Sequence, residues 1–249
     1  MREGVHSVGH IAKLDVSRQA RTGVPEVVLA EGKLDHHLVA ICREFVEVGG
    51  RVVVSRLEES RLPLFRDLPC SLHYYPEARC LVLARPGFDR PRTGGRVAIF
   101  AAGTADIPVA MEARVIAEEL GCDVTTVFDV GVAGIHRLFP ELAKAREADV
   151  VIVAAGREGA LAPVMAGLVD KPVIGLPVST GYGHAGKGEA ALSTMLQSCS
   201  PLVTVNIDAG FVAAASAAKI ANAVAKARNE PSAVPQPVSV DGARARHAE

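Results

Sequence analysis

The stretch DVVIVAAGREGALAPVMAGLVDKPVIGLPV, residues 149–178, decides the fold class of this chain. It contains two apolar runs, 149–155 and 171–178, with a helical segment of small and apolar residues between them. Neither run alternates apolar with polar residues, which is typical of strands buried on both faces of a helix-covered parallel sheet. The stretch therefore predicts a strand–helix–strand unit of an α/β domain.

The same alternation of strand and helix patterns extends over 94–229. Further strands are expected at 96–102, 123–130 and 201–207, and further helices at 105–121, 135–148, 189–199 and 210–228. Five strands separated by helices predict a doubly wound, flavodoxin-like parallel sheet with right-handed crossovers. Ligands of such sheets bind outside the carboxyl ends of the strands, so the loops there are the first candidates for a site.

A smaller α+β domain is expected over 1–93. It has a polar and basic lead, a helical repeat of apolar residues in 34–48, and β-branched strands at 51–56 and 78–85. The Pro- and Gly-containing segment 85–95 marks the boundary to the second domain. Residues 230–249 are polar and Pro-containing, and we expect them to form a disordered tail.

Composition excludes several classes of partner. The 249 residues carry 27 Lys and Arg against 28 Asp and Glu, a net charge of −1, with few aromatics and no Trp, so neither nucleic acid nor a membrane is expected as a partner. No GxGxxG or Walker loop follows the first strand of the sheet, which disfavours a nicotinamide dehydrogenase. The sequence shows no apolar leader and no segment long enough to span a membrane, and its five scattered cysteines have neither zinc-site nor disulfide-framework spacing. We therefore expect a cytoplasmic protein with reduced thiols.

The loops after the predicted strands hold the candidate functional side chains. Thr104 and Asp106 follow the first strand and suit either helix capping or an anion site. His136 follows the second and is either a surface group or a substrate contact. Glu158 follows the third and is either a first-turn helix residue or a general base. Local sequence leaves each alternative open.

The loop PVSTGYGHAGKGEAA, 177–191, is long for a strand–helix connection, and we expect it to close over a substrate. Cys199 ends the helix that follows. A buried cysteine is more often a small apolar residue than a nucleophile, and a helix C-terminus disfavours a thiolate. Activation of Cys199 would need positive charge from another source. Arg18, Arg21 and Lys33 form a basic cluster near the N-terminus. This segment is either an arm that covers the second domain or an oligomer interface, or it takes part directly in the site.

Five motifs in order resemble the LarB family, which makes pyridinium-3,5-biscarboxylic acid mononucleotide for the nickel-pincer nucleotide cofactor. They are RTGVPEVVLAEGK (21–33), AGTADIPVAMEA (102–113), DVGVAGIHRL (129–138), AGREGALAPVMAGLVDKPVIGLPVSTGYG (155–183) and GKGEAALSTMLQSCSPLVTVNIDAGFVAA (186–214). The second domain is also similar, more distantly, to aminoimidazole ribonucleotide (AIR) carboxylase, the PurE family.

The resemblance implies a carboxylase that is also a hydrolase. Its substrates would be nicotinic acid adenine dinucleotide and CO2, with Mg²⁺ assisting release of AMP and no organic cofactor. A thiolate adds to C4 of the pyridinium ring, the resulting enamine carbon attacks CO2, and loss of a proton and of the thiolate restores aromaticity. The cation beside the sulfur favours the thiolate.

The resemblance also implies site residues. Cys199 matches the nucleophile and Glu158 the proton-handling base. The substrate-binding positions match residues of the strand-end loops: Thr104, Asp106, His136, Ser179, Gly181, Tyr182 and Lys187. His136 stands where the purine enzyme has its acid–base histidine, and Lys187 suits CO2 or a phosphate. No metal ligand is assigned.

The resemblance further implies a homo-oligomer, an octamer, and the small residues of the last helix suit close helix packing. Two other functions stay open: an AIR carboxylase or mutase of purine biosynthesis, and a nucleotide-binding module without catalysis. The purine enzymes lack the N-terminal domain and the cysteine of QSC, which ranks the first of these behind the LarB reaction.

Overall fold

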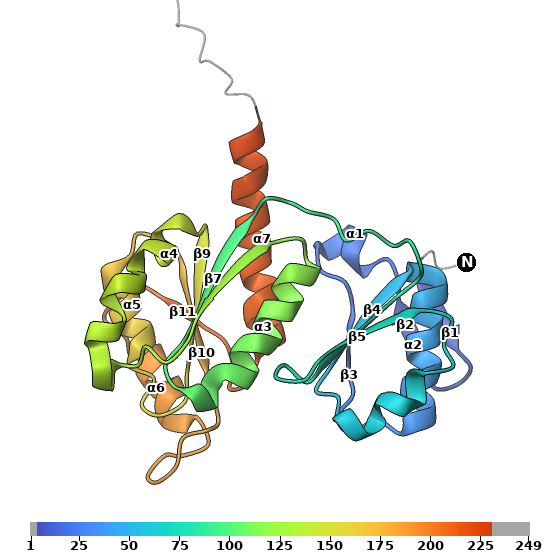
Figure 1. Cartoon of the computed structure of the whole chain (residues 1–249), viewed down its shortest axis with the longest axis horizontal. Coiled ribbons are helices and arrows are strands. Elements are labelled where there is room, and N and C mark those ends of the chain that lie inside the picture. The colour runs from blue at the N-terminus through green and yellow to red at the C-terminus, as the bar shows by residue number, and fades with distance from the viewer. Residues whose placement is uncertain (1–3, 231–249) are drawn as a thin grey trace, which may run out of the picture.

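A computed structural model describes residues 4–230, which form two domains joined by an irregular segment at 85–95 (Figure 1). The larger domain contains a five-stranded sheet in the order β11-β10-β9-β7-β8, and every pair in it is parallel. Its strands are β7 (Arg96–Ala101), β8 (Asp123–Val127), β9 (Val150–Ala155), β10 (Val173–Pro177) and β11 (Val203–Thr204). This is the flavodoxin-like order, so the predicted fold class is confirmed.

The two strands of the opening stretch are buried along their whole length, as their unbroken apolar sequence predicts. Helices cover both faces of the sheet: α3 (Ile107–Glu119), α4 (Leu142–Glu147), α5 (Leu161–Leu168), α6 (Glu189–Leu196) and α7 (Gly210–Asn229). One apolar core lies between the sheet and α3 with α7, and a second lies between the sheet and α4 with α5. All strands consequently end at one common edge, the lower edge in Figure 1.

One predicted helix needs correction. The expected helix at 135–148 is broken into the 3-10 segments η3 (Val132–Arg137) and η4 (Phe139–Glu141) before α4. Gly134 has a non-helical backbone, and Pro140 has no amide hydrogen to donate. The buried small residues of α7 pack against α3 and the sheet of the same chain, and the contact between copies expected of this helix stays a prediction.

The smaller domain has a four-stranded mixed sheet in the order β3-β4-β6-β5 and a separate hairpin β1-β2. Its elements are β1 (Val5–Val8), β2 (Ala12–Asp15), α1 (Arg18–Thr22), β3 (Val27–Leu29), α2 (Asp35–Gly49), β4 (Arg51–Ser55), η1 (Glu59–Phe65), β5 (Ser71–Tyr75) and β6 (Cys80–Ala84). The strands expected at 51–56 and 78–85 are therefore present as β4 and β6. The helix α2 packs on one face of this sheet.

The other face of the small sheet packs against the larger domain. Val52 and Val54 point into the core under α2, whereas Val53, between them, joins the core that contains α3 and α7. This alternation is the normal consequence of the pleat of a strand. Arg51 and the buried Glu119 add an ion pair across the same interface. The small domain is therefore fixed alongside α3 (Figure 1).

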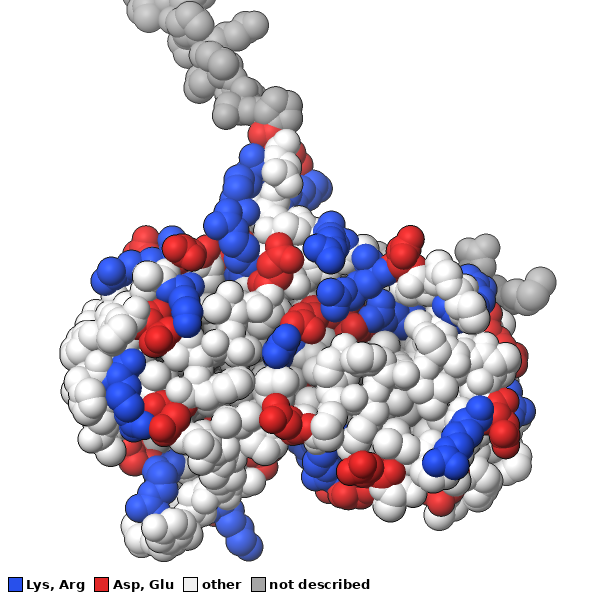
Figure 2. All heavy atoms as spheres, in the orientation of Figure 1, with Lys and Arg blue, Asp and Glu red and all other residues white. Residues whose placement is uncertain are grey.

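Basic and acidic side chains are interspersed over the face drawn in Figure 2, as the balanced composition leads one to expect. Among residues 4–230, none of the helices combines the length and hydropathy needed to cross a bilayer. The tail expected to be disordered lies, apart from Glu230, outside the described residues.

Candidate active site

A cavity of about 420 Å³ opens at the carboxyl ends of β7, β9 and β10. The loops after these strands form its wall, as the parallel topology requires. Its polar lining comes from Asp106, Arg137, Arg157, Glu158, Thr180 and Tyr182. We call this cavity the cleft. The structure thus brings together three residues predicted for the site, Asp106, Glu158 and Tyr182.

Asp106 is the buried acid of the cleft, with 5% of its surface exposed. Its Oδ2 accepts a hydrogen bond of 2.9 Å from the amide of Gly103, and its Oδ1 accepts one of 2.9 Å from Thr180 Oγ1. Burial raises the pKa of Asp106 above its usual range, against the lowering effect of these bonds. Both oxygens are engaged, so Asp106 holds the loops after β7 and β10 together.

Glycines let these loops approach one another. A Cβ at Gly156 would lie 2.2 Å from Thr180 Oγ1 and 2.7 Å from Asp106 Oδ1. A Cβ at Gly181 would lie 2.3 Å from the carbonyl oxygen of Gly156. Neither distance leaves room for a methyl group, which explains why both positions are glycine. Gly181 therefore shapes the site through its backbone.

Glu158 follows β9 and is exposed in the cleft. Within residues 4–230 its carboxylate has no hydrogen-bond or ion-pair partner, so it is available to a ligand. The adjacent Arg157 lies over the ring of Tyr182, 4.1 Å from its centroid, and the two form a cation–π pair across the cleft. Arg137 extends from η3 and pairs with Asp129. The cleft therefore combines a free carboxylate with two guanidinium groups.

Four other predicted residues lie near the cleft without lining it. Thr104 is exposed on the turn before α3, and His136 is exposed on η3, where its neighbour Arg137 contributes the side chain instead. Lys187 is exposed on the loop after β10, and its amide donates to the Gly181 carbonyl at 3.0 Å. Ser179 faces a second cavity, which lies between the two domains.

Cys199 is exposed and lines neither cavity. It follows α6, which returns the chain from the cleft edge of the sheet, and it precedes β11 by four residues. β11 begins opposite Ile174, near the start of β10. Cys199 therefore lies toward the amino ends of the strands. The five residues of β10 separate this amino edge of the sheet from the carboxyl edge, where the cleft opens, by about 16 Å. A single chain does not bring this thiol to Glu158.

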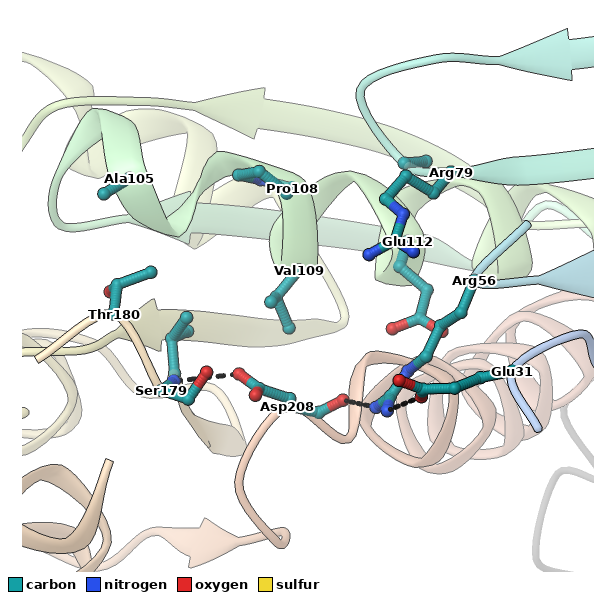
Figure 3. Close-up of a pocket in the computed structure, with 12 residues that line it drawn as sticks. Glu31, Arg56, Arg79, Ala105, Pro108, Val109, Glu112, Ser179, Thr180 and Asp208 are labelled. Atoms are coloured by element: carbon teal, nitrogen blue, oxygen red, sulfur yellow. Dashed lines mark hydrogen bonds and ion pairs between the residues drawn. The ribbon is translucent and has the colours of Figure 1, made fainter. Parts of the chain in front are cut away.

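A second cavity, of about 280 Å³, lies between the two domains (Figure 3). The small domain contributes Arg56 and Arg79, and the large domain contributes Glu112, Ser179 and Asp208. We call it the interdomain cavity. Ala105 and Thr180 line both this cavity and the cleft, so the two are neighbours.

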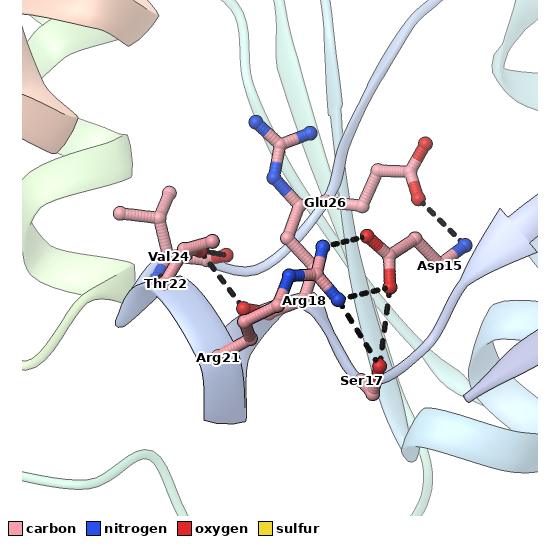
Figure 4. Close-up of polar contacts among 7 residues, drawn as sticks. All are labelled: Asp15, Ser17, Arg18, Arg21, Thr22, Val24 and Glu26. Atoms are coloured by element: carbon pink, nitrogen blue, oxygen red, sulfur yellow. Dashed lines mark hydrogen bonds and ion pairs between the residues drawn. The ribbon is translucent and has the colours of Figure 1, made fainter. Parts of the chain in front are cut away.

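The N-terminal basic cluster is mainly structural (Figure 4). Arg21 pairs with Asp15 and thereby lowers the pKa of that carboxyl, while Glu26 accepts the amide of Asp15 at 3.1 Å. Neither Arg18 nor Arg21 lines the cleft or the interdomain cavity. The segment instead contributes Val24 to the core shared with α3 and α7, which favours the first of the two alternatives, an arm against the second domain.

Sequence reasoning missed Thr180, Arg137 and Arg157 as site residues. Each is adjacent in sequence to a residue that was chosen, so the strand-end loops were recognised but the orientation of individual side chains was not. No group of three or more His, Cys, Asp or Glu side chains within 4–230 is arranged to hold a metal ion. Such a site would have to borrow oxygens from a ligand.

Comparison with known proteins extends over both domains. Residues 5–85 match the family described as LarB/PurE-like N-terminal domain, and residues 96–232 match AIR carboxylase. An uncharacterized protein of Methanocaldococcus jannaschii is 42% identical over 222 residues, which is 86% of this chain and 85% of that protein. The N5-carboxyaminoimidazole ribonucleotide mutase of the same organism is 35% identical over 127 residues, 50% of this chain and 77% of the enzyme.

Proposed function

Because the chain belongs to the LarB family, with a PurE-like second domain, we propose that it carboxylates nicotinic acid adenine dinucleotide and releases AMP. The products would be pyridinium-3,5-biscarboxylic acid mononucleotide and AMP, the first step toward the nickel-pincer nucleotide. One observation carries this choice over the purine reaction. The matching purine mutase covers only half of this chain, and residues 5–85, which precede that half, match the LarB/PurE-like N-terminal domain.

The cleft supports the proposal through its charges. A pyridinium ring is a cation, and the Glu158 carboxylate has no competing partner among residues 4–230. The guanidinium groups of Arg137 and Arg157 suit the carboxylate and phosphate groups that the same substrate carries. We assign Glu158 the removal of the ring proton, because its oxygens are free whereas those of Asp106 are occupied.

The proposed carboxylation proceeds through a covalent adduct. The Cys199 thiolate forms a bond to ring C4, and the ring becomes a neutral enamine. The neighbouring carbon forms a bond to CO2, Glu158 takes the proton from that carbon, and the carbon–sulfur bond breaks with return of the thiolate. Water then cleaves the phosphoanhydride. Residues 4–230 offer no protein-only metal cluster, so no step is assigned to Mg²⁺.

Since Cys199 lies away from the cleft of its own chain, the proposal requires Cys199 of a second copy. Two apolar residues within four positions of Cys199 in the sequence, Leu196 and Val203, are 66% and 60% exposed, and β11 is an edge strand. Exposed apolar groups beside a free strand edge favour contact with another chain. We propose a symmetric homo-oligomer, an octamer, in which neighbouring chains complete one another's sites.

The experiment is incubation with the dinucleotide, bicarbonate and Mg²⁺, followed by mass spectrometry of the products. We expect AMP and a dicarboxylated mononucleotide from the wild type, none from Cys199→Ala, and normal amounts from Cys70→Ala, a matched cysteine of the small domain. Full turnover by Cys199→Ala would refute the covalent step. Binding of the dinucleotide without AMP release would indicate a binding module instead.

The purine reaction is the second candidate because of the 35% identity to the mutase. Replacing the dinucleotide with aminoimidazole ribonucleotide, or with its N5-carboxylated form, tests it. Turnover of either compound, with none of the dinucleotide, would reverse the ranking.

A further inference from the structure

The interdomain cavity is built from two chemically different walls. Arg56, at the end of β4, and Arg79, on the turn before β6, lie on one side, and Figure 3 shows them facing Ser179 and Thr180 across the space. Apolar side chains, among them Pro108 and Val109 of α3, lie between these polar groups. The small domain thus presents two cations to a space that adjoins the cleft.

The two guanidinium groups are available to an anion. Arg79 pairs with Glu58, and Arg56 pairs with Glu31 at 3.1 Å, but these ion pairs are solvent-exposed and such pairs contribute little. Arg56 also donates from Nη2 to the carbonyl oxygen of Asp208 at 2.7 Å, which fixes its position. Exposed pairs of this kind exchange readily for the two parallel bonds that an arginine forms with a phosphate.

The remaining carboxylates of the cavity already have partners. Asp208 accepts the amide of Ser179 at 2.8 Å. Glu112 accepts the hydroxyl of Ser55, and burial raises its pKa, which favours its uncharged form. These acids therefore oppose a bound anion less than their number suggests.

Backbone conformation independently marks the same place. Arg56, Arg79 and Asp208 have φ angles of 54°, 49° and 55°, in the left-handed region that residues with a Cβ rarely adopt. They account for three of the six such non-glycine residues among 4–230, and all three line this one cavity. Strained backbone of this kind gathers where side chains are held for a ligand.

We propose that the interdomain cavity binds a nucleoside monophosphate group, the adenylate half of the dinucleotide whose pyridinium half occupies the cleft. The identity of the whole substrate rests on the proposed function, whereas the phosphate-binding role of Arg56 and Arg79 rests on the cavity itself. Ala105 and Thr180, which line both spaces, would lie beside the phosphoanhydride. The small domain would thereby bind the part of the substrate that leaves as AMP.

Calorimetric titration of the full-length protein with AMP tests the proposal without any turnover. Arg79→Gln should raise the Kd for AMP by roughly tenfold or more. Arg79→Lys keeps the positive charge but loses the planar guanidinium that forms two parallel hydrogen bonds with a phosphate, so it should raise the Kd less. Arg66→Gln, an exposed arginine of the same domain outside the cavity, should leave it unchanged. The Arg79 side chain is 45% exposed, so folding is not at stake.

A second ligand distinguishes binding in the cleft from binding in the interdomain cavity. Nicotinic acid mononucleotide, which lacks the adenylate half, should bind wild type and Arg79→Gln equally, while Glu158→Gln should change its affinity and leave that of AMP intact. Absence of AMP binding, or equal AMP affinity in wild type and Arg79→Gln, would overturn the proposal. Absence of dinucleotide turnover would instead refute the proposed function and leave the AMP result standing.

Discussion

Two inactive variants should restore each other if the site is shared between copies. Cys199→Ala retains Glu158, and Glu158→Gln retains Cys199. In one chain these two residues lie toward opposite edges of a sheet whose strand β10 spans about 16 Å, far beyond the roughly 3–3.5 Å separation that bond formation needs. Each variant alone should therefore be inactive, and only sites built from both kinds of chain should turn over.

The expected recovery follows from random assembly. If a site takes its carboxylate from one chain and its thiol from a neighbour, a site works when the first chain is Cys199→Ala and the second is Glu158→Gln. With equal amounts of the two chains, about a quarter of all sites meet this condition. A site built within one chain would recover no activity, because every chain carries one of the two substitutions.

The assay is co-expression of the two variants with different affinity tags, tandem purification of mixed oligomers, and measurement of AMP release from the dinucleotide. Oligomers of either variant alone provide the baseline, and wild type sets the full rate. Activity of mixed oligomers at the baseline, with active wild type, would refute the shared site. Light scattering that shows a monomer would refute it as well.

Three further substitutions test the packing of the structure. Gly156→Ala should abolish turnover and destabilise the protein by about 1–3 kcal/mol, because the added methyl group overlaps two side chains of the cleft. The control is Gly103→Ala, where the atom nearest to the added methyl group is 3.5 Å away, and it should change neither turnover nor stability much. Activity assays and urea unfolding measure both effects. Arg51→Ala removes the nearer of two cations from the buried Glu119 carboxylate, which keeps only Arg90 at 3.7 Å, and should cost about 2–3 kcal/mol. Arg114→Ala, in a partly exposed helix pair, should cost less than about 1 kcal/mol, and equal losses in urea unfolding would contradict the close contact of Arg51 with Glu119. Burial raises the pKa of Glu112 above its ordinary 4.5, so the folded protein holds this proton more tightly than the unfolded chain and loses stability as pH rises past 4.5. Glu112→Gln should flatten that loss on the alkaline side of pH 4.5, and an unchanged slope would count against the buried position of this acid.

The candidate site was predictable only as far as topology determines it. Asp106 and Glu158 come together because parallel strands end at one edge of the sheet, and their strands were recognisable from apolar runs alone. Arg137, rather than the predicted His136, reaches the cleft because these residues lie on the 3-10 segment η3. A continuous α-helix at 135–148, as predicted, would orient the side chains differently. Side-chain direction on irregular segments depends on contacts that a sequence pattern does not encode.

The small domain illustrates the same limit. β5 was not predicted, because its residues Ser71–Tyr75 are exposed or half-buried and lack an apolar run. β4 was predicted, but its two apolar faces pack on different partners, α2 and α3, and nothing in RVVVSR distinguishes them. The interdomain cavity, with Arg56 and Arg79 on one wall, follows from that packing and was therefore invisible in the sequence.

By itself the sequence determined the strands of the large domain and most of its helices, the order of its motifs and the edge of the sheet at which the candidate site lies. Those features depend on short-range periodicity, since burial on both faces leaves its mark residue by residue. Only the tertiary structure decided that the small domain lies against α3 and that Cys199 is separated from the cleft by the length of a strand. Both depend on contacts between residues far apart in the chain, where many arrangements satisfy the same local pattern and packing selects one.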